Sequence, residues 1–171
     1  MTIPYRGTTG DGTYFVTSST FQKKALLQSE RMATLLIETL IEYRNQQKYQ
    51  LHEFVVMPDH IHLLITPIVT LERAVQLIKG GFSFRAGKLY HLQGGLWQTS
   101  FYDRRVRDAA EYEGFKQYIR WNPVKRGLAR SPEEYVYGSA SGSTELDPLP
   151  QRLKPSVDQE IRRSAKALLH P

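Results

Sequence analysis

The spacing of apolar residues predicts alternating strands and helices along most of the chain. Residues 14–20 are rich in β-branched and aromatic side chains, which is typical of a strand. Within residues 28–45, apolar side chains recur at i, i+3, i+4, i+7 and i+8, which predicts an amphipathic helix. Two apolar runs, 51–57 and 61–66, flank Pro58-Asp59, a pair suited to a tight turn, and therefore predict a hairpin.

A second helix and a fourth strand are predicted after this hairpin. Thr70 is a suitable N-cap, because its hydroxyl can accept a hydrogen bond from an exposed backbone N–H, and residues 71–78 repeat the helical spacing. Gly80-Gly81 should weaken or kink this helix. Residues 96–106 contain three aromatic residues and predict a strand.

A third helix is predicted from a capping signal. Asp108 and Glu111 form a capping box, and apolar residues follow it at helical spacing. Proline disfavours helical geometry in the residue before it, so the helix should end at Asn122 or start again with Pro123 in a first turn.

This order of elements predicts an α+β fold of the ferredoxin-like, split βαβ type. The simplest structure with this order is a four-stranded antiparallel sheet with helices packed on it and one added helix toward the C-terminus. We expect one domain over residues 1–140, followed by a tail over residues 141–171 with a short helix at 157–169.

The composition fits one compact domain in a reducing compartment. The chain has 171 residues, of which 40% are hydrophobic, and it has no cysteine, which excludes disulfides, thiolate zinc sites and a cysteine nucleophile. Neither a leader pattern nor an apolar run of the roughly 18 residues that a membrane span requires is evident. We therefore expect a soluble cytoplasmic protein with no membrane partner.

The net charge of +6 is concentrated in one segment. Residues 104–130 hold eight basic and three acidic residues, a net +5, interleaved with aromatic residues. Basic groups can neutralise phosphates and aromatic rings can stack on unpaired bases, although a solvated helix face would have the same composition. The candidate DNA-binding residues of this segment are Arg104, Arg105, Arg107, Lys116, Arg120, Lys125 and Arg126. Two further candidates, Lys79 and Arg85, lie earlier in the chain.

Candidate chemistry lies at two separate places in the sequence. His60 and His62 flank Ile61 on a predicted strand, where alternation places both imidazoles on one face, and two such imidazoles can bind one divalent ion. Tyr118 and Asn122 lie four residues apart on one helix face, so an amide oxygen could complete the metal site beside a phenol that attacks phosphorus. Taken singly, each pattern is also compatible with ordinary packing.

Together, the two motifs resemble a known family. Residues 55–64, Val-Val-Met-Pro-Asp-His-Ile-His-Leu-Leu, resemble the HUH motif of the single-tyrosine transposases, in which U is a bulky apolar residue. Residues 118–128, Tyr-Ile-Arg-Trp-Asn-Pro-Val-Lys-Arg-Gly-Leu, are similar to their tyrosine helix. With Leu-Trp-Gln at 96–98, the chain is most similar to the REP-associated branch, over roughly residues 10–140.

The resemblance implies a catalytic domain that acts on single-stranded DNA next to a hairpin. His60 and His62 match the metal-binding histidines, Asn122 the polar residue that completes the metal site, and Tyr118 the nucleophile. The implied cofactor is Mg²⁺ or Mn²⁺, and the implied reaction passes through a 5′-phosphotyrosine and leaves a free 3′-hydroxyl. Some relatives pair their domains, so both a homodimer and a monomer are compatible with the resemblance.

Two other functions remain open at this point. A non-catalytic module that binds hairpin nucleic acid could have the same fold and basic residues. A His-x-His metallo-phosphoesterase would need further ligands nearby, whereas Leu63 and Leu64 follow the motif here. A cyclic phosphodiesterase would need two His-x-Thr/Ser motifs, whereas the sequence has a single His-x-His and no second copy.

Overall fold

The computed structural model describes residues 12–154 and contains one four-stranded antiparallel sheet. The spatial order of the strands is β2-β3-β1-β4. Each neighbouring pair is antiparallel, which confirms the ferredoxin-like arrangement expected from the sequence. The strands are β1 (Tyr14–Ser19), β2 (Tyr49–Met57), β3 (His60–Pro67) and β4 (Tyr102–Arg105).

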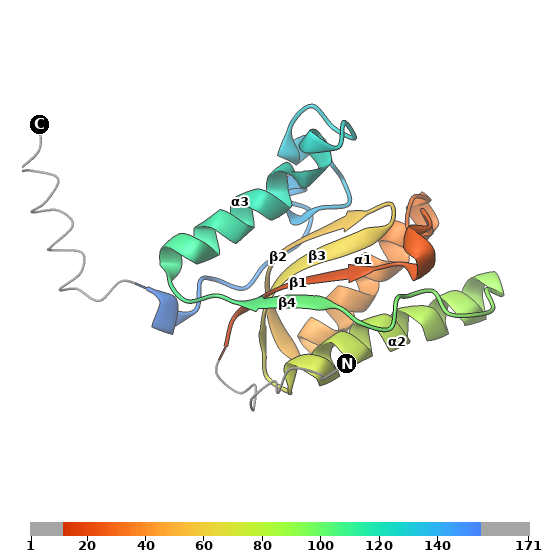
Figure 1. Ribbon diagram of the computed structural model, residues 1–171, viewed down its shortest axis with the longest axis horizontal. Coiled ribbons are helices and arrows are strands. Elements are labelled where there is room, and N and C mark those ends of the chain that lie inside the picture. Colours follow the sequence, from red (N-terminus) through yellow and green to blue (C-terminus); the bar gives the residue numbers. More distant parts are fainter. Residues whose placement is uncertain (1–11, 155–171) are drawn as a thin grey trace, which may run out of the picture.

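In the described part of the chain, three α-helices cover the two faces of this sheet. Figure 1 shows α1 and α2 on one face and α3 on the other. The helices are α1 (Glu30–Asn45), α2 (Leu71–Tyr90) and α3 (Ala109–Lys125), and the short 3₁₀ turns are η1 (Phe21–Lys23), η2 (Pro132–Glu134), η3 (Ser139–Ser141) and η4 (Gln151–Leu153). Asp108 caps α3 as expected, because its carboxylate accepts a hydrogen bond from Glu111 N at 2.8 Å.

Alternation along β3 decides which residues face the site. Ile61, Leu63 and Ile65 are buried in the cluster that includes the apolar faces of α1 and α2. Leu64 points the other way, into the cluster that includes Ile119 of α3. Burial of each such side chain contributes about 1.5–3 kcal/mol to stability, so a register slip of one residue is strongly disfavoured. This register holds the even-numbered residues of β3 on the α3 side.

Helix α2 is not interrupted at its glycine pair. It continues through Gly80 and Gly81 to Tyr90. A Cβ atom on Gly81 would lie 2.5 Å from the Tyr43 hydroxyl of α1. The glycine pair therefore does not end the helix, and Gly81 allows close approach of the two helices.

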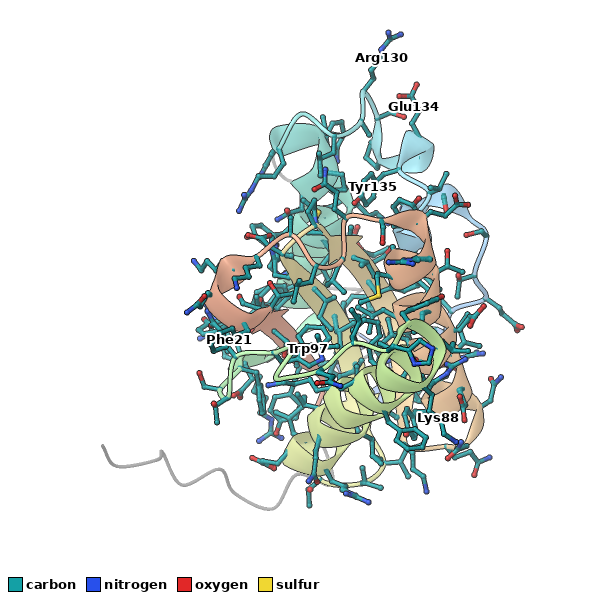
Figure 2. The ribbon with its side chains drawn as sticks, turned by 90° about the vertical axis from the view of Figure 1, so that its right-hand side faces the viewer. Phe21, Lys88, Trp97, Arg130, Glu134 and Tyr135 are labelled. Atoms are coloured by element: carbon teal, nitrogen blue, oxygen red, sulfur yellow. The ribbon has the colours of Figure 1, made fainter. Side chains whose placement is uncertain are left out.

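The predicted strand at 96–106 is shortened to the four residues of β4. Leu96 and Trp97 are buried in the core instead, and the Trp97 ring lies 5.6 Å from the ring of Phe82 on α2. Phe21 N donates a hydrogen bond to Leu96 O at 2.9 Å, and Figure 2 labels Phe21 and Trp97 from these adjoining segments. Trp97, one of the aromatic residues that suggested a longer strand, is thus a core residue of a connecting segment.

Helix α3 also runs further than expected, because Pro123 lies inside it and the helix ends at Lys125. Arg126 N donates to Asn122 O at 3.1 Å, and Gly127 takes a left-handed conformation with φ 70° after the helix end. Ile119 is completely buried and Pro123 is buried as well. Packing against the sheet therefore keeps the last turn helical despite the missing N–H of proline.

The described part of the predicted tail packs against the domain. The Asp147 carboxylate accepts from Arg44 Nε at 2.9 Å and from Leu51 N at 2.7 Å, and Leu153 is buried against the α3 side of the sheet. The predicted helix at 157–169 lies outside the described residues. Between residues 12 and 154, no helix is both long enough and apolar enough to cross a membrane.

Candidate active site

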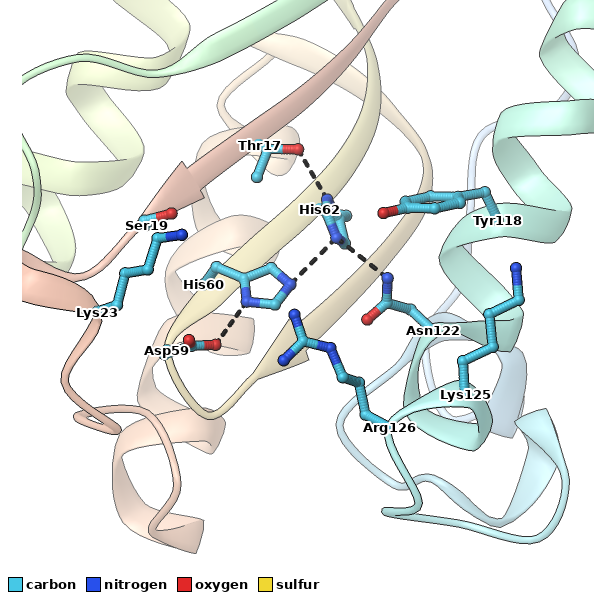
Figure 3. Close-up of a pocket in the computed structure, with 10 residues that line it drawn as sticks. All are labelled: Thr17, Ser19, Lys23, Asp59, His60, His62, Tyr118, Asn122, Lys125 and Arg126. Carbon is cyan, nitrogen blue, oxygen red and sulfur yellow. Dashed lines mark hydrogen bonds and ion pairs between the residues drawn. The ribbon is translucent and has the colours of Figure 1, made fainter.

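The two histidines of the His-x-His motif meet in a pocket between the sheet and α3. Their side chains point to the same side of β3, as alternation predicts, and the two Nε2 atoms are 3.1 Å apart. The pocket has a volume of about 360 Å³. Figure 3 shows the residues that line it: Thr17, Ser19, Lys23, Asp59, His60, His62, Tyr118, Asn122, Lys125 and Arg126.

The Nδ1 atom of each imidazole has its own hydrogen-bonding partner. His60 Nδ1 lies 2.6 Å from the Asp59 carboxylate, and His62 Nδ1 lies 2.8 Å from the Thr17 hydroxyl. A carboxylate accepts only, which places a proton on His60 Nδ1. The two Nε2 atoms are left to face each other, and such a pair is satisfied by a shared proton or by a cation. These partners orient the rings as outer-shell groups orient metal ligands.

Helix α3 brings the other two candidate residues to the same place. Asn122 Nδ2 lies 3.3 Å from His62 Nε2, and the Tyr118 ring lies 5.3 Å from the His62 ring. Tyr118 is 42% exposed, whereas Asn122 is 6% exposed. In Figure 3 the Tyr118 hydroxyl points toward the histidines. The phenol is therefore accessible from solvent beside a buried polar group.

Burial and positive charge control the electrostatics of the pocket. Burial, then the neighbouring His60 and Arg126, lower the pKa of His62 to about 3 against the opposing effect of Asp59. His62 is therefore neutral at physiological pH, which is the form that binds metals. Lys125 Nζ lies 5.6 Å from the centre of the Tyr118 ring, and with Arg126 it makes the α3 side of the pocket attractive to phosphate.

The comparisons with known proteins agree on one family. A family model described as "Transposase IS200 like" matches residues 11–122, which is more than half of the chain. The chain belongs to this family. The resemblance to transposases of this kind, inferred from the two motifs, is thereby confirmed.

Individual relatives support the same placement. A REP-associated tyrosine transposase of Escherichia coli is 22% identical over 130 residues, with 75% of this chain and 76% of the relative covered. A Haemophilus influenzae protein, provisionally named a REP-associated tyrosine transposase, is 23% identical over 176 residues, with 92% and 96% covered. A solved structure of a REP-associated tyrosine transposase bound to a REP hairpin matches with a TM-score of 0.69 at 22% identity, with 91% of this chain and 96% of that chain covered. The two proteins therefore share the fold.

The donor set of this transposase chain fits a divalent cation with one amide ligand. Within the described residues, no three His, Cys, Asp or Glu side chains converge on one point, so a third protein ligand has to be of another type. Asn122 Oδ1 is buried and has no hydrogen-bond partner, and a half-turn of the amide would exchange it with the Nδ2 atom that faces His62. Two imidazole nitrogens and one amide oxygen can bind Mg²⁺ or Mn²⁺, with water or phosphate oxygens completing the coordination.

The structure separates the basic residues that the sequence grouped together. Lys125 and Arg126 line the pocket, but Arg120 points to the opposite flank of α3, where its Nε lies 3.2 Å from the fully buried Glu53 carboxylate. Lys116 lines a second cavity on that flank, together with Arg120. Only the end of α3 therefore brings predicted DNA-binding residues beside Tyr118.

The remaining predicted DNA-binding residues lie away from the pocket. Arg104 and Arg107 both bond to Glu111, and Arg105 is exposed on β4. Lys79 Nζ donates to Gln98 O at 2.6 Å, and burial lowers the pKa of this lysine. Arg85 pairs with Glu38 and Glu42 of α1, on the far side of the sheet.

Four residues that line the pocket were not found from the sequence: Thr17, Ser19, Lys23 and Asp59. Thr17 lies opposite His62 in the β1–β3 register, and Asp59 is the turn residue before His60. Alternation on the first strand could have placed Thr17 on the histidine face once the pairing of the strands was known. Lys23 could not have been found in this way, because an irregular turn brings it to the pocket.

Proposed function

We propose that the protein nicks and rejoins single-stranded DNA beside a hairpin, with Tyr118 as the nucleophile. The observation that carries this proposal is the convergence of Tyr118 with His60, His62 and Asn122 in one basic pocket. Family membership supports DNA transposition, and the relatives named for REP elements, one of them solved with a REP hairpin, support hairpin DNA as the partner.

In this reaction the phenolic oxygen of Tyr118 attacks a backbone phosphorus. A bond forms between the tyrosine oxygen and phosphorus, and the bond from phosphorus to the 3′ oxygen breaks. The DNA fragment on the 3′ side of the nick stays linked to the protein through a 5′-phosphotyrosine, and the fragment on the 5′ side ends in a free 3′-hydroxyl. Because the covalent link conserves the phosphodiester, attack by a 3′-hydroxyl can reverse the step without an external energy source.

The other residues of the pocket have distinct roles in the proposal. His60, His62 and Asn122 would hold Mg²⁺ or Mn²⁺, which supplies polarisation of a phosphate oxygen and charge neutralisation when bound. Lys125 and Arg126 hold the phosphate next to Tyr118. The half-exposed Tyr118 ring stays positioned by its contacts with Phe15 and His62, whose ring centres lie 5.7 and 5.3 Å away.

The test uses hairpin oligonucleotides with a single-stranded flank, labelled at one end or the other. After incubation with Mg²⁺ or Mn²⁺, a denaturing gel should show protein linked to the 3′-labelled fragment, while the 5′-labelled fragment is released free. Tyr118→Phe should abolish the linked product and leave hairpin binding nearly intact, because the ring can still pack.

Tyr112→Phe is the matched control on the same helix. Tyr112 is buried on the other flank of α3 and does not line the pocket, so this variant should form the linked product normally. A linked product from Tyr118→Phe would exclude Tyr118 as the nucleophile. Hairpin binding without any linked product from the unaltered protein would favour the non-catalytic alternative.

A further inference from the structure

A lysine lies across the pocket from Tyr118. Ser19 lies at the end of β1 and Lys23 lies in η1, whereas Tyr118 comes from α3. Figure 3 shows Lys23 on one side of the two histidines and Tyr118 on the other. The other basic residues that line this pocket, Lys125 and Arg126, belong to the α3 side. The wall opposite the nucleophile therefore has its own cationic group.

The backbone holds Lys23 in an uncommon conformation. Gln22 and Lys23 both have left-handed φ angles, 54° and 53°, which residues with a side chain rarely adopt. The Thr20 hydroxyl lies 2.6 Å from Lys24 O and 2.9 Å from Asp59 O, and Thr20 N donates to the same Asp59 oxygen. These contacts attach the turn to the residue before His60. Strained residues that are fixed in this way concentrate at functional sites.

The direction of the proposed reaction gives this wall a role. In a phosphoryl transfer, the attacking and leaving oxygens lie roughly in line through phosphorus. With Tyr118 attacking from the α3 side, the 3′ oxygen has to leave toward the β1–η1 wall. Lys23 is the basic side chain that lines this wall.

We propose that Lys23 is a catalytic residue that protonates the leaving 3′ oxygen, an inference that rests on the proposed function. As the bond from Tyr118 to phosphorus forms, the bond to the 3′ oxygen breaks and its electron pair stays on that oxygen. The oxygen takes a proton from the Lys23 ammonium, and the phenol proton passes to solvent. In the rejoining direction, the neutral Lys23 amine removes the proton of the attacking 3′-hydroxyl.

A substrate with sulfur in place of the leaving 3′ oxygen tests this assignment. A thiolate leaves without prior protonation, because thiols are far more acidic than alcohols. On the ordinary oxygen substrate, Lys23→Met should slow single-turnover formation of the linked product by about 100-fold or more, the usual contribution of a general acid. On the sulfur substrate, measured with Mn²⁺, the same variant should react at nearly the rate of the unaltered protein.

Two further variants separate proton donation from charge and folding. Lys23→Arg keeps a positive charge, but a guanidinium does not release its proton, so this variant should also be slow on the oxygen substrate only. Lys24→Met is the matched control, because Lys24 does not line the pocket and its Nζ lies 6.0 Å from the centre of the Phe21 ring. It should match the unaltered protein on both substrates.

The outcomes distinguish this inference from the proposed function. Equal slowing of Lys23→Met on both substrates would overturn proton donation, as would no slowing on either or full activity of Lys23→Arg on the oxygen substrate. The proposed function would survive each of these results. Absence of linked product from the unaltered protein on both substrates would overturn the proposed function, and this inference with it.

Discussion

The ion pair between Arg120 and Glu53 provides a test of how α3 is held on the sheet. Glu53 is completely buried on β2, and its carboxylate contacts both Arg120 Nε, at 3.2 Å, and the Ser139 hydroxyl. Burial raises the pKa of Glu53 against the opposing effects of Ser139 and Arg120. Arg120→Met removes the cation but keeps the aliphatic packing, which leaves a buried carboxylate without its partner.

The expected cost follows from the burial of the two groups. Leaving one member of a buried ion pair uncompensated costs roughly 3–5 kcal/mol. The Arg120 side chain is 31% exposed, so water can approach the pair, and we expect about 3 kcal/mol, at the low end of this range. With a urea m-value of about 2 kcal/mol/M, this loss shifts the unfolding midpoint by roughly 1.5 M.

Urea unfolding followed by circular dichroism measures this effect. Because the folded pKa of Glu53 lies above its unfolded value, protonation favours the folded state, and the deficit of Arg120→Met should shrink as the pH falls from 7 to 5. Adding Glu53→Gln to Arg120→Met should restore most of the stability. An unchanged midpoint in the single variant, or a double variant no more stable than the single one, would refute the reasoning.

Three further predictions concern charge, metal affinity and DNA affinity. Burial tends to raise the pKa of Asp147, but Arg44 and the Leu51 N–H lower it overall, so the stabilisation by its carboxylate is lost at acid pH. Asp147→Ala should therefore reduce the free energy of unfolding, measured by urea titration, by about 2 kcal/mol at pH 7 and by less at pH 3. Thr17→Val should weaken Mn²⁺ binding about 10- to 100-fold by calorimetry, with Thr17→Ser near normal. Lys125→Met should reduce the salt dependence of hairpin binding, measured by fluorescence anisotropy, by a slope of about 0.7.

The parts of the site that follow local periodicity could be predicted from the sequence. Alternation on a strand is enough to place His60 and His62 on one face, and a spacing of four residues is enough to place Tyr118 above Asn122 on α3. The meeting of these two pairs is a long-range contact. It was expected through the family resemblance and not from either spacing alone.

The parts that depend on tertiary packing could not be predicted. Arg120 follows Tyr118 by two residues and lies in the basic segment that predicts DNA binding, yet its partner is Glu53, which is far away in the sequence. The sequence predicts only that Gly80-Gly81 weakens or kinks the helix, because the closeness of Gly81 to Tyr43 is invisible in it. Lys23 was missed because a left-handed turn has no hydrophobic period that would reveal where its side chain lies.

The most direct measurement of the central claim is to locate the covalent DNA link on the protein. The unaltered protein is incubated with a hairpin oligonucleotide and Mn²⁺, the DNA is digested to a short remnant, and the peptides are analysed by mass spectrometry. The account predicts a 5′-linked nucleotide remnant on the peptide containing Tyr118, attached to that tyrosine. A remnant on any other residue, or an adduct that still forms in Tyr118→Phe, would contradict it.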